Sequence, residues 1–358
     1  MSAEQETGWL DDRCRELLET LLVTHAPSGF EEEMQKACVG MLGDMGIEAE
    51  VDLRGNVIVH LGGSGPRVGF MAHTDEIGLM VSRIHDDGKM EVEPLGGIYP
   101  WAFGEGPWEV LGDEPILGVL SFGSVHVSER SGDVQRIKGA KVIDWSLPRL
   151  DCKMSREELE RRGVRVGAAA CVARPRKKPV YIGDYVGGYA LDDKGGVASL
   201  LLAIELFVRG GQQPGGDVYF IFTSAEEIGT HGAGQVAQAL ELDGAVAVDV
   251  APIAPEYPIE PGPTPVVILK DSYAVYSPEL SELLAKKSEE VIGSVQRSVV
   301  RSYGSDASGN LRRGAVSRGA LLGFATENTH GFEVAHLGGI VNCARVIAAS
   351  IPALEEAF

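Results

Sequence analysis

The chain has 358 residues, 44 % of them hydrophobic and 23 % charged, and its formal net charge at pH 7 is −20. This length allows about two domains with a sizeable core, while the negative charge argues against nucleic acid and anionic membranes as partners, because both attract positively charged proteins. The five cysteines are scattered without a CxxC pair, and the polar start has no apolar stretch typical of a signal peptide. We therefore predict free thiols, no disulfide framework and a cytoplasmic location.

The first part of the chain is predicted to begin with two helices and to continue with strands. Apolar residues at helical spacing predict a helix over residues 10–23. Ser28 and Glu31 have the spacing of a capping box, which would open a second helix toward Leu42. A hairpin and a compact apolar strand follow at residues 47–51, 57–61 and 68–72.

Residues 79–179 have a different character, and we predict that they form a small inserted domain rich in β-strands. Short alternating segments are separated there by turn-forming residues such as Gly96-Gly97. One helix is predicted over residues 155–162, with Ser155 as its N-cap and Glu158 completing a capping box. The α/β part would then consist of residues 1–78 and 180–358.

After the insertion, strands again alternate with helices. The most apolar helical stretch that we identify, residues 197–208, is too short to span a bilayer and contains Glu205. Strands are predicted at residues 218–222, 245–248, 266–269 and 320–325, and helices at 232–239, 278–291 and 340–358. This alternation predicts an α/β fold, with a doubly wound sheet covered by helices on both faces.

Acidic and histidine side chains follow the ends of these predicted strands or, in one pair, open the helix after the insertion. They are His73, Asp75, Asp192, Asp193, Glu226, Glu227, Asp249 and His330. Ligands of open α/β sheets gather at the carboxyl ends of the strands. We therefore expect these side chains to lie together at one edge of the sheet.

Taken singly, each of these residues has a simpler interpretation. Asp192 and Asp193 can cap a helix and complement its dipole, and an isolated histidine is more often structural than a metal ligand. Together they favour a metal site, because a mixed imidazole and carboxylate set suits Zn²⁺, Co²⁺ or Mn²⁺. Five ligands with one shared carboxylate are enough for two ions about 3.5–4 Å apart. The adjacent acids Glu226 and Glu227 can supply one ligand and one general base.

Around these residues the sequence resembles the M42 family of two-metal aminopeptidases, which includes glutamyl aminopeptidase and the tetrahedral aminopeptidases. The resemblance runs through nearly the whole chain, in short motifs that keep the same order. They are Ala26-Pro-Ser-Gly29 with Glu31, Gly55-Asn-Val-Ile58, Ala72-His-Thr-Asp-Glu-Ile-Gly78, Leu191-Asp-Asp-Lys-Gly195, Ala225-Glu-Glu-Ile-Gly229, Ala247-Val-Asp249 and Gly304-Ser-Asp-Ala307. The inserted segment looks like that family's PDZ-like dimerisation domain, notably at Gly118-Val-Leu and Ser155-Arg-Glu-Glu158.

The resemblance implies a mixed sheet of the zinc-exopeptidase type and a role for each site residue. His73 and Asp249 would hold one divalent ion, Glu227 and His330 the other, and Asp192 would bridge them. Glu226 would be the general base, and Asp75 would orient His73, as metal-bound imidazoles usually require. The implied reaction is attack of a metal-bridged hydroxide on the first carbonyl of a short peptide. The implied assembly is a homo-oligomer built from dimers, up to a dodecamer.

Several alternatives stay open at this point. The flanks of His330 depart from the family pattern, so His336 is a rival ligand by spacing. His231 could contact substrate or be a hydrogen-bonded loop residue, and Asp306 could approach the site or belong to a turn. The rival functions are a related two-metal amidohydrolase, such as an M20-type deacylase or dipeptidase, and an inactive binding scaffold. Endoglucanase activity has little support, because the ligand set offers no acid pair of glycosidase type.

Overall fold

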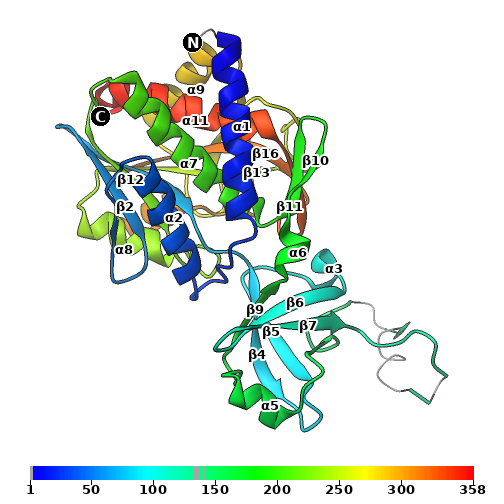
Figure 1. Ribbon diagram of the computed structural model, residues 1–358. Coiled ribbons are helices and arrows are strands. Elements are labelled where there is room, and N and C mark those ends of the chain that lie inside the picture. The colour runs from blue at the N-terminus through cyan, green and yellow to red at the C-terminus, as the bar shows by residue number, and fades with distance from the viewer. Residues whose placement is uncertain (1–2, 129, 132–137, 140–141) are drawn as a thin grey trace.

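The computed structural model describes residues 3–128, 130–131, 138–139 and 142–358. They form an eleven-stranded sheet and a closed six-stranded barrel. In Figure 1 the two ends of the chain build the helix-covered sheet, while the barrel, drawn in cyan and green, lies below it. The fold is therefore a mixed α/β fold into which a β-barrel is inserted.

The centre of the large sheet consists of four parallel strands. Their order is β12 (Asp217–Thr223), β3 (Arg67–His73), β13 (Gly244–Pro252) and β16 (Arg318–Glu327). The other strands are β1 (Glu50–Val51) and β2 (Val57–Gly62) beside β12, then β17 (Phe332–His336), β11 (Tyr185–Tyr189) and β10 (Val180–Ile182) beyond β16, with β14 (Val266–Lys270) pairing β16 and β15 (Gln296–Val299). Because the central strands are parallel, their carboxyl ends share one edge of the sheet.

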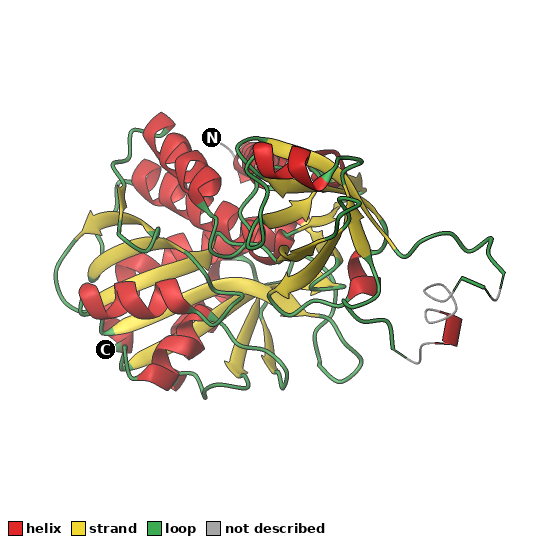
Figure 2. Ribbon diagram, turned by 90° about the horizontal axis from the view of Figure 1, so that it is seen from below, coloured by secondary structure: helices red, strands yellow, loops and turns green. Residues whose placement is uncertain are grey.

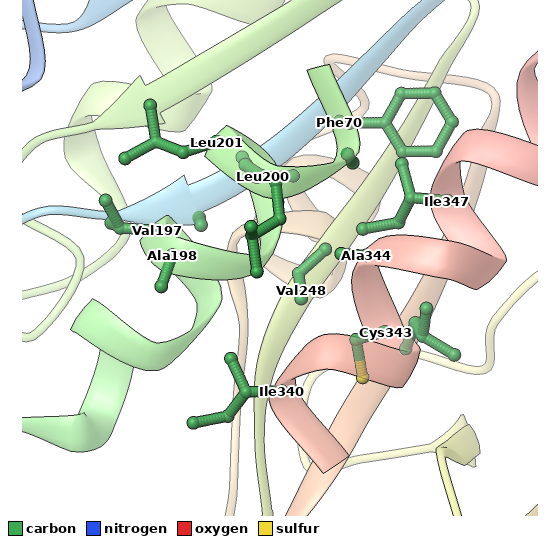
Figure 3. Packing of buried hydrophobic residues seen from close by; sticks show 14 of the residues in the cluster. Phe70, Val197, Ala198, Leu200, Leu201, Val248, Ile340, Cys343, Ala344 and Ile347 are labelled. Atoms are coloured by element: carbon green, nitrogen blue, oxygen red, sulfur yellow. The ribbon is translucent and has the colours of Figure 1, made fainter. Parts of the chain in front are cut away.

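Helices cover both faces of this sheet (Figure 2). Phe70 and Met71 are neighbours in β3, so their side chains point to opposite faces, and each belongs to a different buried cluster. The face of Phe70 is covered by α1 (Ala3–Leu21), α2 (Glu32–Asp44), α7 (Leu191–Gly210), α9 (Pro278–Val291) and α11 (Leu337–Ser350), and the face of Met71 by α8 (His231–Ala239) and α10 (Asp306–Arg313). Figure 3 shows side chains of α7 and α11 meeting around Val248 of β13. The central strands are therefore buried on both faces.

The barrel closes in the order β4-β5-β8-β7-β6-β9. Its strands are β4 (Gly78–Ile84), β5 (Met90–Leu95), β6 (Gly106–Leu111), β7 (Pro115–Ser121), β8 (Arg149–Asp151) and β9 (Ala169–Val172), and its short helices are α3 (Pro100–Phe103), α5 (Arg156–Arg161) and α6 (Arg174–Lys177). Trp108 is fully buried in its core. Ser155 caps α5 as predicted, since its hydroxyl accepts from the N–H of Glu158 at 3.3 Å.

The capping box predicted for Ser28 and Glu31 is wrong. Glu31 occupies the N-cap position of α2 without a side-chain cap, and its carboxylate accepts from the N–H groups of Gly29 and Ala225. Ser28 instead donates its hydroxyl hydrogen to the carboxylate of Asp75 at 2.7 Å. Both side chains are used for contacts with distant parts of the chain, which local spacing does not reveal.

The C-terminal helix also differs from the prediction. The α-helix ends at Ser350, and a 3₁₀ helix, η1 (Ile351–Ala357), follows it. Pro352 lies in the first turn of η1, where its missing N–H prevents continuation of the α-helical bonding. Together the two form a stretch, Leu337–Ala357, that is long and apolar enough to cross a membrane, and it is longer than residues 197–208, the predicted most apolar helical stretch. Most of this stretch is buried against the other helices and the sheet, as in a core helix.

Candidate active site

Two strands bring the first site residues together. In the parallel pair of β3 and β12, His73 lies opposite Thr223, the last residue of β12. The chain turns immediately beyond Thr223, which carries Glu226 and Glu227 to the same sheet edge. Asp249 lies within β13, one strand further along. These side chains thus lie near one edge of the sheet, although Asp249 lies three residues before the end of its strand and does not follow it.

Five of the predicted residues form two groups of possible metal ligands. His73, Asp192 and Asp249 offer ligand atoms that all lie within 4.8 Å of one another, and so do Asp192, Glu227 and His330. Asp192 belongs to both groups. Its Oδ1 lies 3.0 Å from Nε2 of His73, and its Oδ2 lies 3.6 Å from Nε2 of His330. The two oxygens of one carboxylate thus face the two histidines.

Asp75 holds the backbone of the segment that carries the paired glutamates. Its carboxylate is fully buried and accepts hydrogen bonds from the N–H of Glu226 at 2.9 Å and of Glu227 at 3.1 Å, besides the bond from Ser28. Nδ1 of His73 lies 3.0 Å from the backbone carbonyl of Asp75 and 3.5 Å from its carboxylate. Donation from Nδ1 to that carbonyl leaves Nε2 free to accept, as a metal-binding imidazole requires.

Glu333 bonds to the backbone of two residues of the second ligand group. Its buried carboxylate accepts from the N–H of Asp192 at 2.9 Å and from the N–H of His330 at 3.0 Å. Glu333 follows His330 by three residues in the sequence, but no local pattern assigns it this function. The signal that could have found it is a lone acid among the apolar residues of β17.

The structure also distinguishes among the histidines whose roles the sequence left open. His330 lies in the turn after β16, and its Nδ1 bonds to the carbonyl of Gly97. His336 caps α11, where its Nδ1 accepts from the N–H of Gly338, and it belongs to neither ligand group. His231 is exposed at the start of α8. Of the two rival histidines, the structure brings only His330 to the site.

Asp306 lies in a helix, α10, and not in a turn. It is buried, and one carboxylate oxygen accepts from the hydroxyl of Thr223 while the other has no partner. Burial raises the pKa of Asp306 to about 6. Asp193, the neighbour of Asp192, accepts from the N–H groups of Gly196 and His73 and so caps the helical part of α7.

The charges of the site fit divalent cations. Burial and neighbouring carboxylates raise the pKa values of Glu226, Glu227 and Asp249 well above their usual range. One carboxylate oxygen of Glu227 is buried without a hydrogen-bond partner. A cation would compensate both the crowding of negative charge and this unpaired acceptor. The donor set of two imidazoles and three carboxylates suits Zn²⁺, Co²⁺ or Mn²⁺.

A third group of possible ligands, His25, Glu76 and Cys171, does not fit a cation. The ammonium groups of Lys177 and Lys194 already lie 2.6 and 3.1 Å from the carboxylate of Glu76. These two positive charges occupy the place that an ion would take.

A cavity of about 490 Å³ opens in front of the two ligand groups. Its floor contains His73, Asp192 and Glu226, while Tyr99 and Trp101 of the barrel segment around α3 contribute to its wall. Both parts of the fold therefore shape the same cavity.

Known proteins resemble this chain along most of its length. A sequence profile described as M42 glutamyl aminopeptidase matches residues 55–346. A lysyl aminopeptidase of Pyrococcus furiosus is 32 % identical over 246 residues, which are 66 % of this chain and 66 % of that protein. A solved aminopeptidase from the archaeon Desulfurococcus kamchatkensis has a TM-score of 0.84 at 26 % identity, covering 96 % of this chain and 95 % of that one. The TET1 peptidase of Pyrococcus horikoshii, which can assemble into a tetrahedron or a large octahedral shell, has a TM-score of 0.81 at 28 % identity, covering 94 % and 99 %.

Proposed function

Because the chain belongs to the M42 family of glutamyl aminopeptidases and is thus a peptide hydrolase, we propose that it removes the N-terminal residue of short peptides with two divalent ions. The ions would be Zn²⁺ or Co²⁺, with Mn²⁺ as a further candidate. The observation that carries the proposal is the position of Asp192, whose two carboxylate oxygens face His73 and His330. A shared carboxylate of this kind is typical of two-metal hydrolases.

The proposed ligands follow the two groups of donors. His73 and Asp249 would hold one ion, Glu227 and His330 the other, and Asp192 both. Such ions, when bound, polarise a carbonyl oxygen and lower the pKa of water. The unpartnered oxygen of Glu227 supports its assignment as a ligand.

Glu226 is the proposed general base. It lines the cavity, belongs to neither ligand group, and has a pKa raised by burial. A raised pKa suits a carboxylate that takes a proton from water and returns it to the leaving amine. Asp75 would be a positioning residue, since it bonds to the backbone N–H of Glu226 and contacts His73.

The rival functions gain no support. Membership of an aminopeptidase family does not favour an M20-type deacylase or dipeptidase. An inactive scaffold would not need a base candidate beside five grouped ligand candidates. No basic face for nucleic acid is predicted from the charge of −20.

We further propose that residues 1–78 and 180–358 are the catalytic domain and residues 79–179 a PDZ-like domain that joins subunits in a cytoplasmic homo-oligomer. The assembly of the Pyrococcus horikoshii relative supports this. Exposed Leu117 and Val119 on strand β7 of the barrel support it further.

An assay of exopeptidase polarity tests the proposed function. Peptides with a free amine should be cut from the N-terminus, N-acetylated versions should resist, and C-terminally amidated versions should be cut at the same rate. Mass spectrometry of the products reads out all three. Efficient cleavage of acetylated peptides would move the assignment to a deacylase or endopeptidase.

A further inference from the structure

We infer that the cavity selects peptides whose N-terminal side chain is large and uncharged, aromatic above all, and disfavours acidic ones. This rests on the proposed aminopeptidase function and specifies its substrates. It departs from the glutamyl activity in the description of the family profile.

The first argument is charge. Among the described residues that line the cavity, none is a lysine or an arginine, whereas four are carboxylates: Asp192, Glu226, Glu227 and Asp249. Two divalent ions would balance these four charges without leaving a positive surplus. An acidic substrate side chain would therefore lose water without gaining a counter-charge, which is costly in a partly buried site. A neutral side chain has no such cost.

The second argument is the aromatic wall. Tyr99 and Trp101 stack on each other, with ring centroids 5.8 Å apart and planes inclined by 17°. They are 61 % and 66 % exposed, although such large aromatic surfaces are usually covered. Since both line the cavity, an apolar side chain that packs on them would cover this surface and gain hydrophobic free energy.

Tyr273 adds a ring to the lining. It lies against Gly304, where a Cβ atom would come closer to the ring than van der Waals contact permits. The missing side chain of Gly304 thus lets the ring seat against the backbone. The same cavity as the carboxylates is thus lined by four aromatic residues: Tyr99, Trp101, Tyr273 and Tyr303.

Two arginines outside the cavity lining could overturn the charge argument: Arg313, which donates to the carbonyl of Gly229 and the hydroxyl of Thr230 in that lining, and Arg312. The guanidinium of Arg312 lies 4.8 Å from the ring centre of Tyr273, but the side chain is not part of the cavity lining. We infer that it supports the ring and does not bind an acidic substrate. A substitution of Arg312 is therefore included in the experiment below.

The test compares substrates that differ only in charge. The metal-loaded protein is assayed with aminoacyl amidomethylcoumarins of phenylalanine, leucine, glutamine, glutamate and lysine. We expect kcat/KM for glutamine to exceed that for glutamate by at least about tenfold, and phenylalanine to be the best of the five. Glutamate equal to or better than glutamine overturns the charge argument, and lysine better than phenylalanine overturns the aromatic preference.

Substitutions test which residue causes the selectivity. Trp101→Ala should lower kcat/KM for the phenylalanine substrate at least about tenfold relative to the glutamine substrate, and Trp101→Phe should largely restore it. Leu53→Ala, in the exposed β1–β2 turn, is the control. Equal losses on all five substrates, or an effect confined to the second residue of dipeptides, would contradict this role of Trp101. Arg312→Gln should leave the ratio of glutamate to glutamine unchanged, and a selective loss on glutamate would contradict the inference.

Binding separates this inference from the proposed function. Calorimetry with free L-phenylalanine and L-glutamate measures affinity for the metal-loaded protein without turnover. Tighter binding of phenylalanine supports the inference, and tighter binding of glutamate overturns it. If no substrate were hydrolysed, the proposed function would fail, and calorimetry would still decide the preference of the cavity.

Discussion

Glu76 and Lys177 form a buried ion pair, with 2.6 Å between the carboxylate oxygen and Nζ. The other oxygen of Glu76 accepts from Lys194 at 3.1 Å, and both ammonium groups also donate to the carbonyl of Thr24. Lys177 ends the short helix α6 after the last barrel strand, and Lys194 lies in α7. Glu76 therefore ties the exit of β3 to both segments, one residue beyond Asp75.

The first prediction is that Glu76→Gln destabilises the protein by about 3–5 kcal/mol, because it leaves two buried ammonium groups without their counter-charge. Urea unfolding at pH 7 measures the change. Glu241→Gln is the matched control, since Glu241 pairs with Arg67 at the surface and is 82 % exposed. It should cost less than about 1 kcal/mol. Equal stability of the two variants would show that the Glu76 pair contributes no more than a surface pair.

The pH dependence of this difference follows from the pKa of Glu76, which is lowered from its ordinary value of 4.5 to about 2. Burial opposes this shift, and Lys177 and Lys194 cause it. A lowered folded-state pKa stabilises the folded protein above pH 4.5, and the contribution disappears as the pH falls toward 2. The gap in unfolding free energy between wild type and Glu76→Gln should therefore narrow on acidification. A gap that widens would mean that another group causes the destabilisation.

The second prediction concerns the metal. Removal of divalent ions by a chelator should abolish peptide hydrolysis, and Co²⁺, Zn²⁺ or Mn²⁺ should restore it. The reason is that two imidazoles and three carboxylates of the described cavity lining form two groups of possible metal ligands. Activity is measured beside metal content by mass spectrometry. Full activity in a preparation shown to be free of metal would contradict the two-metal proposal.

The third prediction separates the two adjacent glutamates. Glu226→Gln should lower kcat by about 10²–10⁴ and leave two ions bound, as expected for loss of a general base. Glu227→Gln should release one ion, because its carboxylate lies 3.9 Å from Nε2 of His330 in the second ligand group. Metal analysis of both variants decides the matter. The same metal loss in both would show that the two functions are wrongly assigned.

The fourth prediction concerns Glu333, which positions the backbone of Asp192 and His330. Glu333→Ala should weaken binding of one ion by about 10–100-fold, as is typical when a group behind the ligands is lost. Glu327→Ala, at the exposed end of β16, is the control. Competition with a metal indicator measures the affinity. If Glu333→Ala kept both ions with unchanged affinity but unfolded at lower denaturant, its function would be structural.

The candidate site was predictable to the extent that its residues follow short, strongly apolar strands. His73 is the last residue of such a strand, and neighbouring parallel strands end at the same edge of the sheet. Glu333 and Ser28 were not predictable in this way. Each bonds to a residue more than forty positions away, and that pairing depends on strand order.

Several elements of the fold were not predicted, some because their local sequence pattern is weak and some because they depend on pairing between distant segments. Strands β10, β11 and β17 lie at one side of the sheet and are short, with glycines in β11, so their sequence carries little β-pattern. Ser305 is the N-cap of helix α10, and its capping box is completed by Ser308 and not by the usual acid or amide. The closure of the barrel is set by pairing between strands far apart in sequence, which local pattern does not specify.

The last prediction is assembly through the barrel. In the closed barrel β7 pairs with both β6 and β8, so β7 has no free edge. Association through the barrel must therefore use the outer face of its strands. Leu117 and Val119 alternate with buried residues on β7 and stay exposed, as expected for a face that meets another subunit. We expect at least a dimer at micromolar concentration by light scattering, and monomers for the double variant Leu117→Glu and Val119→Glu. Leu53→Glu, fully exposed in the β1–β2 turn, should not dissociate it.

Salt provides an independent check of this assembly. Each chain carries a net charge of −20, so the long-range force between subunits is repulsive, and screening should strengthen association through an apolar face. The fraction of dimer or larger species should accordingly rise between low and physiological ionic strength. Dissociation by salt would instead indicate that paired charges hold the subunits together. A wild-type monomer under all these conditions would refute assembly and leave the proposed chemistry untouched.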